Sequence, residues 1–303
     1  MPHLPLRFVA IFIAALFLFG GRSQSGAEGS PQPLTGQQLP PSFENTPSRH
    51  VRFRYAIRNG SGAAIEHGRL AVYAPAGKSA TFSASLPFAT TTDPLGNHLL
   101  QFTLPPLPPF ASTSVLLEGD VPASRAPQAV TAAESAPFLL PAPLIESDRP
   151  ELMSLAATLH KANPRESARA MHDWVSQHLR YSGYRAENRG ALAALAARSG
   201  DCTEYMTLFI ALCRADGIPA RGVAGFLCAG DCLPSASTWH NWSEVLLDGA
   251  WRIVDPQKGN FLRREEQYLA LRLLGFENGE SDNFAGLYKV EGGALLVALE
   301  SGG

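Results

Sequence analysis

The sequence predicts an α+β fold, and three observations carry that prediction. Short runs of alternating apolar and polar residues follow one another between residues 49 and 121, a pattern typical of antiparallel strands. Helical patterns with apolar faces follow between residues 151 and 217. Two aromatic-rich runs separated by Asp248-Gly249 then predict a β-hairpin over residues 239–256. Strands and helices in separate stretches of a chain indicate α+β rather than alternating α/β architecture.

Composition sets the class of protein. The chain has 303 residues, of which 45% are hydrophobic and 17% charged, values typical of a globular protein with room for one large or two medium domains. The formal net charge of −2 gives no reason to expect a nucleic-acid partner.

The first residues predict export. Arg7 precedes twelve apolar residues, Phe8 to Phe19, and Ser25-Gly26-Ala27 resembles a small-x-small cleavage site. We therefore expect a signal peptide over residues 1–27, with the mature protein periplasmic or extracellular. If the segment is instead retained, it would be a membrane anchor. Residues 28–48 are rich in Gly, Pro, Gln and Ser and are expected to form a flexible lead-in.

Residues 49–121 are expected to form an antiparallel β-sandwich. Asn59-Gly60 and Asp93–Asn97 have the composition of turns between its strands. The strands are expected at Val51–Ile57, Arg69–Tyr73, Ala80–Phe88, Leu99–Leu104 and Thr113–Glu118. We expect this domain to act as a spacer or scaffold; a dedicated ligand-binding role is the alternative.

A stretch dense in Pro, Ala and Ser, residues 122–150, is expected to be a linker across the surface, followed by a catalytic domain over 151–303. Within that domain Asn163-Pro164 should cap a helix that ends at Tyr181. Further helices are expected at 151–161, 191–198 and 265–274, a strand at 217–227, and a closing hairpin from the runs 287–290 and 294–299.

The stretch from Cys202 to Ala215 predicts a buried helix with a cysteine at its first position. Asp201 has the residue type of an N-cap, Glu204 completes a capping box, and Gly217 before Pro219 ends the helix. Unpaired amides and the helix dipole at this end favour a thiolate. A thiol enzyme would place its nucleophile here.

The hairpin predicts a partner for that cysteine. If Asp248-Gly249 is a two-residue loop, Trp242 faces Asp255, and His240 is the diagonal neighbour of Asp255 on the same face. A shift of one residue would put the two side chains on opposite faces. The loop must therefore be even-numbered, or a bulge must restore the phase.

These motifs together resemble the core of the transglutaminase-like superfamily, over roughly residues 168–260. The resemblance rests on three segments in family order: Gly200-Asp201-Cys202 with the helix that closes on Arg214–Arg221, then His240–Val245, then Trp251–Pro256. It implies a papain-like fold in which Cys202 is the nucleophile, His240 the base and Asp255 the residue that orients the base. The three residues are 38 and 15 positions apart.

The implied chemistry is attack of Cys202 on an amide or peptide carbonyl to form a thioester. Water as the acceptor would make the protein a cysteine peptidase or amidase, and this is the expected outcome; an amine acceptor would make it a transglutaminase. A non-catalytic exported binding or assembly module is the rival. We expect a protein or peptide substrate, possibly from the cell envelope, and no cofactor. The sequence contains no recognisable calcium loop.

Other residues near the motifs have expected roles in substrate binding, catalysis or structure. Trp239 adjoins the base and is a candidate for substrate binding. The oxyanion hole is expected to use the Cys202 backbone amide plus a donor from Tyr181, Asn188 or a tryptophan. Asp201 and Glu204 are expected to cap the helix, and Arg214 and Arg221 to form structural pairs.

The four cysteines have different expected roles, which follow from their positions in the sequence. Cys228 and Cys232 could close a disulfide loop before the histidine strand. Zinc is the competing interpretation, but two cysteines with one nearby histidine are an incomplete ligand set. Cys213 lies on the apolar side of its helix and is expected to be buried, which leaves Cys202 unpaired.

Overall fold

The computed structural model describes residues 47–75, 80–123, 129–275 and 287–300, which belong to one compact unit over Asn45–Gly303. The expected signal peptide and nearly all of the lead-in lie outside these residues. Among the helices that the structure describes, none has the length and apolar character needed to cross a bilayer.

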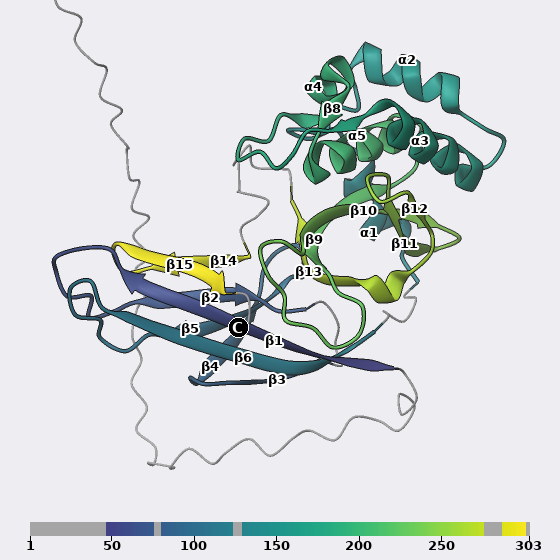
Figure 1. Cartoon of the computed structure of the whole chain (residues 1–303). Coiled ribbons are helices and arrows are strands. Elements are labelled where there is room, and N and C mark those ends of the chain that lie inside the picture. Colours follow the sequence, from purple (N-terminus) through teal and green to yellow (C-terminus); the bar gives the residue numbers. More distant parts are fainter. Residues whose placement is uncertain (1–46, 76–79, 124–128, 276–286, 301–303) are drawn as a thin grey trace, which may run out of the picture. The chain divides into compact units, whose positions relative to one another are not determined.

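Two four-stranded antiparallel sheets make up the β-sandwich (Figure 1). Their strand orders are β15-β1-β6-β3 and β14-β2-β5-β4. The strands are β1 (Ser48–Asn59), β2 (Arg69–Tyr73), β3 (Thr81–Ala84), β4 (Phe88–Thr92), β5 (His98–Thr103), β6 (Ser112–Pro122), β14 (Tyr288–Glu291) and β15 (Leu295–Glu300).

Alternation in the sequence explains why the two sheets pack face to face. Phe53, Tyr55 and Ile57 on β1 are buried while the residues between them face outward or are only half-buried. Across the gap between the sheets, the ring of Tyr55 meets that of Tyr288 edge-on at 6.4 Å. The sandwich predicted for residues 49–121 is therefore present.

The two C-terminal runs do not form the closing hairpin that we expected. β15 pairs with β1, and β14 pairs with β2, so the two strands enter different sheets of the sandwich. Positive φ angles at Gly292 and Gly293 allow the chain to pass from one sheet to the other. Gly292 also approaches the backbone of His67 so closely that a Cβ would lie 2.2 Å from its oxygen.

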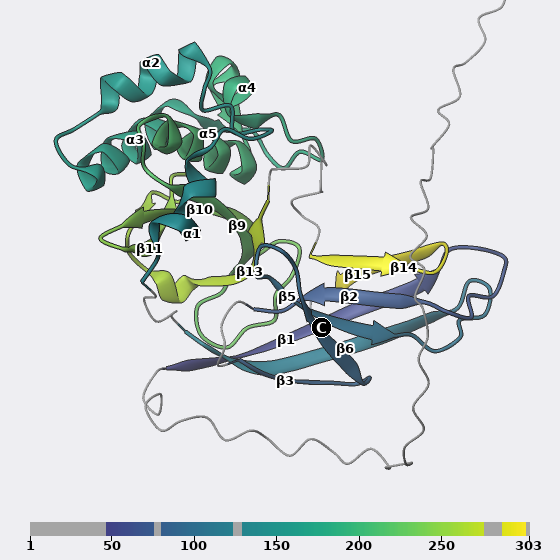
Figure 2. The same cartoon turned by 180° about the vertical axis from the view of Figure 1, so that it is seen from behind.

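A five-stranded antiparallel sheet, in the order β12-β11-β10-β9-β13, is the centre of the second region. Its strands are β9 (Ala220–Leu227), β10 (Trp239–Leu247), β11 (Ala250–Asp255), β12 (Asn260–Phe261) and β13 (Tyr268–Leu274). Both views show the helices α2 to α5 on the same side of this sheet (Figures 1 and 2). They are α2 (Pro150–Leu159), α3 (Pro164–His178), α4 (Gly190–Ala197) and α5 (Cys202–Ala215).

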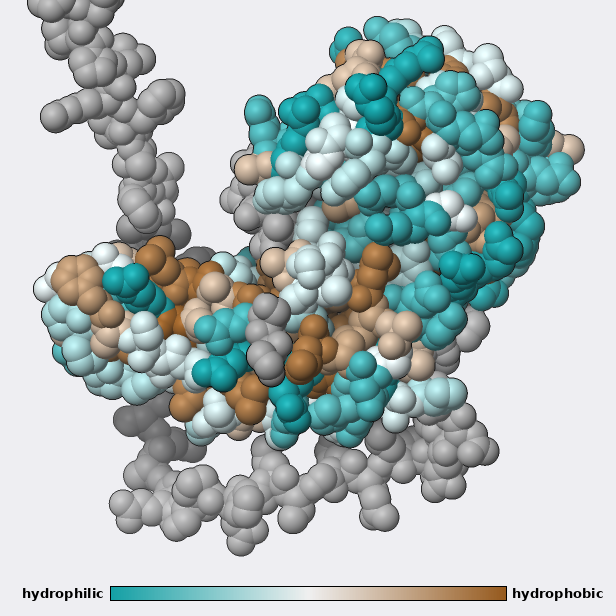
Figure 3. Space-filling model, viewed as in Figure 1, coloured by the Kyte–Doolittle hydropathy of each residue, from teal (hydrophilic) through white to brown (hydrophobic). Residues whose placement is uncertain are grey.

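Local signals account for the helix starts. Asn163 accepts a hydrogen bond from the Glu166 amide, 2.9 Å away, ahead of Pro164, which confirms the predicted cap of α3. This helix ends at His178, and Tyr181 lies beyond it in β7 (Arg180–Tyr181), which pairs in parallel with β8 (Ser199–Gly200). In the view of Figure 3 hydrophilic residues gather over the part of the surface where α3 lies in Figure 1.

One predicted helix is wrong. Residues 265–274 form a short 3-10 helix, η3 (Glu265–Gln267), followed by β13, which pairs with β9. Six of the seven β13 residues are buried, and a strand covered on both faces lacks the alternation that would distinguish it from a buried helix. β9 accommodates this strand at Gly225, where a Cβ would lie 2.0 Å from the oxygen of Leu269.

The expected surface linker has more structure than its composition suggested. Its described part holds α1 (Ala132–Ser135), with Thr131 and Glu134 forming a capping box, and the 3-10 helix η2 (Ala136–Leu139). Most of its side chains are exposed, but Ile145 is fully buried in the core. This segment is therefore anchored against the helices rather than loosely extended.

Candidate active site

The start of α5 holds Cys202 in place through its cap. Asp201 accepts the Thr203 amide at 2.8 Å, and Glu204 accepts the Asp201 amide at 2.9 Å, which confirms the predicted capping box. Gly200 is required before it, because a Cβ there would lie 2.2 Å from the Cβ of Glu204. Cys202 is therefore fixed at the first position of the helix, with 8% of its surface exposed.

The hairpin β10–β11 has the predicted register. Leu247 pairs with Ala250, and the pairing continues in phase to Ser243 and Val254. As the even-numbered loop requires, His240 and Asp255 share a face, and Nε2 of His240 lies 2.7 Å from Oδ2 of Asp255. Both side chains are almost completely buried, so little water competes with this contact.

Hydrogen bonds between α5 and β10 bring the cysteine to the histidine strand. Nδ2 of Asn241 donates to Oγ1 of Thr203 at 3.0 Å, and the backbone amide of Asn241 is a hydrogen-bond donor to the Cys202 sulfur. The sulfur thus lies against the residue that follows His240. The start of α5, with Cys202, therefore lies against β10, the strand that carries His240, and the charge of Asp255 on β11 also reaches the thiol.

The contact with Asp255 assigns the protons of His240. A carboxylate only accepts hydrogen bonds, so Nε2 of His240 is the donor to Asp255, and in the neutral form of the ring Nδ1 carries the lone pair. Nδ1 is therefore the atom that could take a proton from a nearby thiol. The ring of Trp242 stacks on the imidazole at 6.3 Å and restricts its rotation.

Sequence reasoning missed Tyr268, a further neighbour of the pair. Its hydroxyl donates to Oδ2 of Asp255 at 2.9 Å, and the amide of Lys258 approaches the other carboxylate oxygen at 3.2 Å. The position of Tyr268 near the site was not predicted because residues 265–274 were expected to be helical. Recognising β13 as a strand beside β9 would have placed this tyrosine near the hairpin.

Burial has the opposite effect on Cys202 to the one expected from the helix dipole. Loss of solvent raises the pKa of the Cys202 thiol to about 12, and the negative charge of Asp201 contributes in the same direction. The Asn241 amide and the Thr203 hydroxyl act against this rise in pKa but are outweighed. The start of the helix therefore does not lower the pKa of this thiol, contrary to the expectation from the helix dipole.

Three tryptophans differ in their surroundings. Trp242 is buried, and Trp251 packs under the guanidinium of Arg221, 4.1 Å from the ring centre, so neither lines a groove. Trp239 is half-buried, and within the described chain its buried Nε1 has no hydrogen-bond partner. The buried Nε1 of Trp242 also has no partner among the described residues, but Trp239 is the more exposed of the two and directly precedes His240.

The candidate oxyanion donors lie on two segments. Tyr181 on β7 pairs with Gly200, two residues before Cys202, and is 53% exposed. Its pKa is raised by partial desolvation and by the neighbouring Cys202 and Asp201. Asn188 is half-buried in the segment between β7 and α4.

The remaining predicted residues have structural contacts. Arg221 donates through two nitrogens to Oε2 of Glu244, at 2.7 and 2.9 Å, and Arg214 donates to the oxygen of Ala220 at 3.0 Å. Cys213 is buried and free, as predicted.

Cys228 and Cys232 form a disulfide. Their sulfurs are therefore not available to zinc, and the zinc interpretation is wrong. Within the described ranges, no cluster of three metal-ligating side chains occurs.

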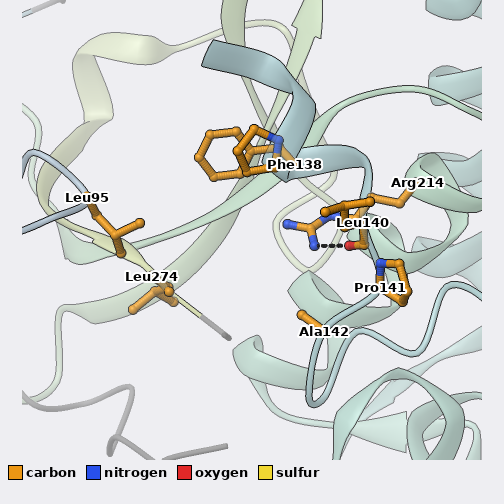
Figure 4. A pocket seen from close by; sticks show the side chains of 9 residues that line it. Leu95, Phe138, Leu140, Pro141, Ala142, Arg214 and Leu274 are labelled. Atoms are coloured by element: carbon orange, nitrogen blue, oxygen red, sulfur yellow. Dashed lines mark hydrogen bonds between the residues drawn. The ribbon is translucent and has the colours of Figure 1, made fainter. Parts of the chain in front are cut away.

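A pocket elsewhere does not belong to this site. Figure 4 shows it between Leu95, Leu274 and the segment from Phe138 to Ala142, with Arg214 donating to the oxygen of Leu140 at 2.6 Å. Neither Trp239 nor any of the residues Cys202, His240 and Asp255 lines it.

Comparisons with known proteins found one family model and several solved structures that match this chain. Residues 153–256 match the model of the transglutaminase-like superfamily, and no curated protein matches. A candidate cysteine protease from Cytophaga hutchinsonii has the same fold, with a TM-score of 0.54 and 17% identity over 84% of this chain and 92% of that one. The periplasmic domain of TgpA from Pseudomonas aeruginosa is 21% identical over 72% of this chain and 74% of that one, with a TM-score of 0.40. The segment 153–256, which carries the cysteine, histidine and aspartate, belongs to the transglutaminase-like superfamily.

Proposed function

We propose that the protein is an exported, thiol-dependent hydrolase that cleaves amide bonds of protein or peptide substrates through a thioester on Cys202. The observation that carries the proposal is the arrangement of three side chains at one junction. Cys202 begins α5 against the strand of His240, and His240 contacts Asp255 at 2.7 Å. A nucleophile, a base and an orienting carboxylate are the parts that acyl transfer needs.

In the first half of the reaction the sulfur attacks the substrate carbonyl carbon. Because burial keeps Cys202 protonated, Nδ1 of His240 takes the thiol proton as the new carbon–sulfur bond forms. The electron pair of the carbonyl moves to its oxygen. When that tetrahedral intermediate collapses, the carbon–nitrogen bond breaks, and the imidazolium returns its proton to the leaving amine.

In the second half, water attacks the thioester. His240 again takes a proton, this time from the water, as the new carbon–oxygen bond forms. When the tetrahedral intermediate collapses, the carbon–sulfur bond breaks to give a carboxylic acid, and the imidazolium returns its proton to the departing sulfur, which restores the free thiol. Asp255 holds the imidazole in the required tautomer and stabilises the imidazolium in both halves. If an amine replaces water in this step, the product is a new amide and the protein is a transglutaminase.

The oxyanion needs two donors. We assign the first to the Cys202 backbone amide, which is at the start of α5, where amides have no partner within the helix. The second donor is Tyr181 or Trp239. Tyr181 lies on the strand beside Gly200, and Trp239 has a buried Nε1 without a hydrogen-bond partner in the described residues.

Two features support export. The N-terminal residues have the composition of a signal peptide, and the Cys228–Cys232 disulfide is typical of oxidising compartments. Exported protein or peptide chains, including those of the cell envelope, are therefore the substrates to test first.

Product analysis tests the reaction type. The mature protein would be incubated with peptide libraries and cell-envelope fragments, with and without a labelled amine, and the products identified by mass spectrometry. The proposal predicts carboxylic-acid products that the Cys202→Ala variant does not form. Amide products containing the labelled amine would indicate a transglutaminase, and no product with any substrate would favour the non-catalytic alternative.

A further inference from the structure

Tyr268 touches the triad without a place in the bond-making steps. Its hydroxyl and Nε2 of His240 both reach the same oxygen of Asp255, at 2.9 and 2.7 Å. Nδ2 of Asn260 donates to that hydroxyl at 3.2 Å and orients its hydrogen toward Asp255. Oδ2 of Asp255 is therefore held between two donors, which opposes rotation of the carboxylate away from the imidazole.

The ring of Tyr268 is held as firmly as its hydroxyl. It meets Trp242 edge-on at 5.0 Å, and Trp242 also stacks on the ring of His240. Tyr268 thus reaches both members of the His240–Asp255 pair, one through a hydrogen bond and the other through a shared tryptophan. A shift of this tyrosine would disturb both.

The backbone of Tyr268 is fixed from the β-sandwich. Arg49 of β1 is 3% exposed, and its guanidinium donates to the oxygens of Cys228, Glu266 and Tyr268, the last at 2.6 Å. One side chain from the other region of the fold thus supplies a donor to three backbone carbonyls around the site.

The same strand also holds the disulfide loop that leads into β10. The amide of Arg52 donates to the oxygen of Cys232 at 3.2 Å, and the Cys232 amide donates to His50 at 3.0 Å. The amide of His50 donates to the carboxylate of Asp231 at 2.7 Å. β1 therefore contacts two segments next to the site: the loop before His240 and the start of β13.

We propose that Tyr268 is a positioning residue for the His240–Asp255 pair and that Arg49 holds it in place, which makes the β-sandwich part of the active-site scaffold. The inference rests on the proposed function, because it assigns a role within that same site. It excludes the view of the sandwich as a detachable spacer.

The charged and titratable neighbours fix the direction of the expected pH effect. Asp255 is faced by His240 on β10, Tyr268 on β13, Cys202 on α5 and His172 on α3. Asp201 lies beside Cys202, and Arg264 lies near Tyr268. Removing the hydroxyl of Tyr268 takes a hydrogen-bond donor from Asp255. The negative charge of the Asp255 carboxylate then acts more fully on the imidazolium of His240. Protonated His240 is then favoured, and the acid limb of activity moves to higher pH.

Tyr268→Phe in the mature full-length protein tests the proposal, with Tyr288→Phe as the matched control. The hydroxyl of Tyr288 donates to Val297 in the sandwich at 2.7 Å, away from the triad. For Tyr268→Phe we expect kcat to fall roughly ten- to a hundredfold with KM within about twofold, and the acid limb to rise by about 0.5 to 1 pH unit. The control should change neither quantity.

Arg49→Met and Arg52→Met test the connection to the sandwich. Arg52 lies on the same strand, but its side chain is exposed and pairs with Glu118 at 3.1 Å. We expect Arg49→Met to reproduce the fall in kcat of Tyr268→Phe and Arg52→Met to leave it unchanged. Arg49→Lys, which keeps the charge but has fewer donors, should give an intermediate kcat and replaces Arg49→Met if that variant does not fold.

Nitrogen-15 NMR of the His240 ring separates the two proposals because it does not need turnover. A raised titration midpoint in Tyr268→Phe but not in Tyr288→Phe supports the positioning role, even if the wild type cleaves no substrate and the proposed function fails. An unchanged midpoint together with an unchanged kcat, in a protein that does turn over, would overturn the positioning role while leaving the proposed function intact.

Discussion

Helix α5 carries one free cysteine at its first residue and another near its last turn. Cys202 and Cys213 are both buried, and burial raises the pKa of both thiols. Burial therefore does not distinguish the two residues.

Their surroundings do. Cys213 is enclosed by the apolar core, with Asp216 raising its pKa further and Arg214 opposing the rise. Cys202 meets the amide of Asn241 and the hydroxyl of Thr203, on the strand and helix that bring it to His240. A raised pKa therefore does not separate Cys202 from Cys213, but the polar contacts of Cys202 and its position beside the strand of His240 do.

The largest expected difference is in turnover. Cys202→Ala should lower kcat by at least about a thousandfold, because no other group can form the thioester. Cys213→Ala should leave kcat within about threefold, at a cost in stability of roughly 1 kcal/mol from the lost core packing. Steady-state kinetics and thermal unfolding of the two variants measure this. Equal losses of activity would remove the distinction between the two ends of α5.

The base should depend on its carboxylate. Asp255→Asn is expected to lower kcat by roughly a hundred- to ten-thousandfold, because an amide can stabilise the wrong tautomer of His240. Asp248→Asn is the matched control: Asp248 lies in the exposed hairpin loop and pairs with Arg165. Its kcat should stay within about twofold of the wild type. A mild effect of Asp255→Asn would mean that His240 is oriented by other contacts.

Loss of the hydrogen bond between Thr203 on α5 and Asn241 on β10 should have a smaller effect. Thr203→Val removes the hydroxyl that accepts from Asn241 and that opposes the rise in the Cys202 pKa. We expect kcat/KM, and the rate of alkylation of Cys202 at neutral pH, to fall about tenfold. Thr207→Val, one turn further along the helix, loses only a bond to the backbone of Glu204. If both variants behave alike, the contact with Asn241 has no special role.

At neutral pH the Cys202 thiol should have no effect on stability, and its effect should appear only in alkali. The pKa of Cys202 is raised from an ordinary value of 9.0 to about 12 in the folded state, so above pH 9 the unfolded chain binds fewer protons than the folded one. The free energy of unfolding should therefore be undiminished by this group below pH 9 and fall by up to about 1.4 kcal/mol per pH unit between pH 9 and 12. Cys202→Ala should make this fall less steep without abolishing it, because the pKa of the Cys213 thiol is also raised by burial, and urea unfolding across this range measures the difference. An unchanged slope would show that the thiol is less shielded than the structure indicates.

Local rules were enough to predict the helix position of Cys202 and the shared face of His240 and Asp255. The cap at Asp201 placed Cys202 at the first helical position, and the two-residue loop at Asp248-Gly249 fixed which side of the hairpin carries His240 and Asp255. Each rule acts within a few residues along the chain. The structure has both features as predicted.

Contacts between distant segments could not be predicted in the same way. Tyr268 lies on a strand buried on both faces, whose apolar run is equally compatible with a helix. Arg49 binds backbone oxygens, which any sequence supplies, on segments 179 to 219 residues away. The two C-terminal strands likewise enter the sandwich, where their partners β1 and β2 come from the other end of the described chain.

Direct detection of the thioester tests the central claim. The mature protein would be mixed with a cleavable peptide, quenched in acid within milliseconds to seconds, and digested for mass spectrometry. We predict an acyl adduct on the peptide that contains Cys202, absent in Cys202→Ala, strongly reduced in His240→Ala and never found on Cys213. Product formation with no adduct on Cys202, or with the adduct on another residue, would contradict the account.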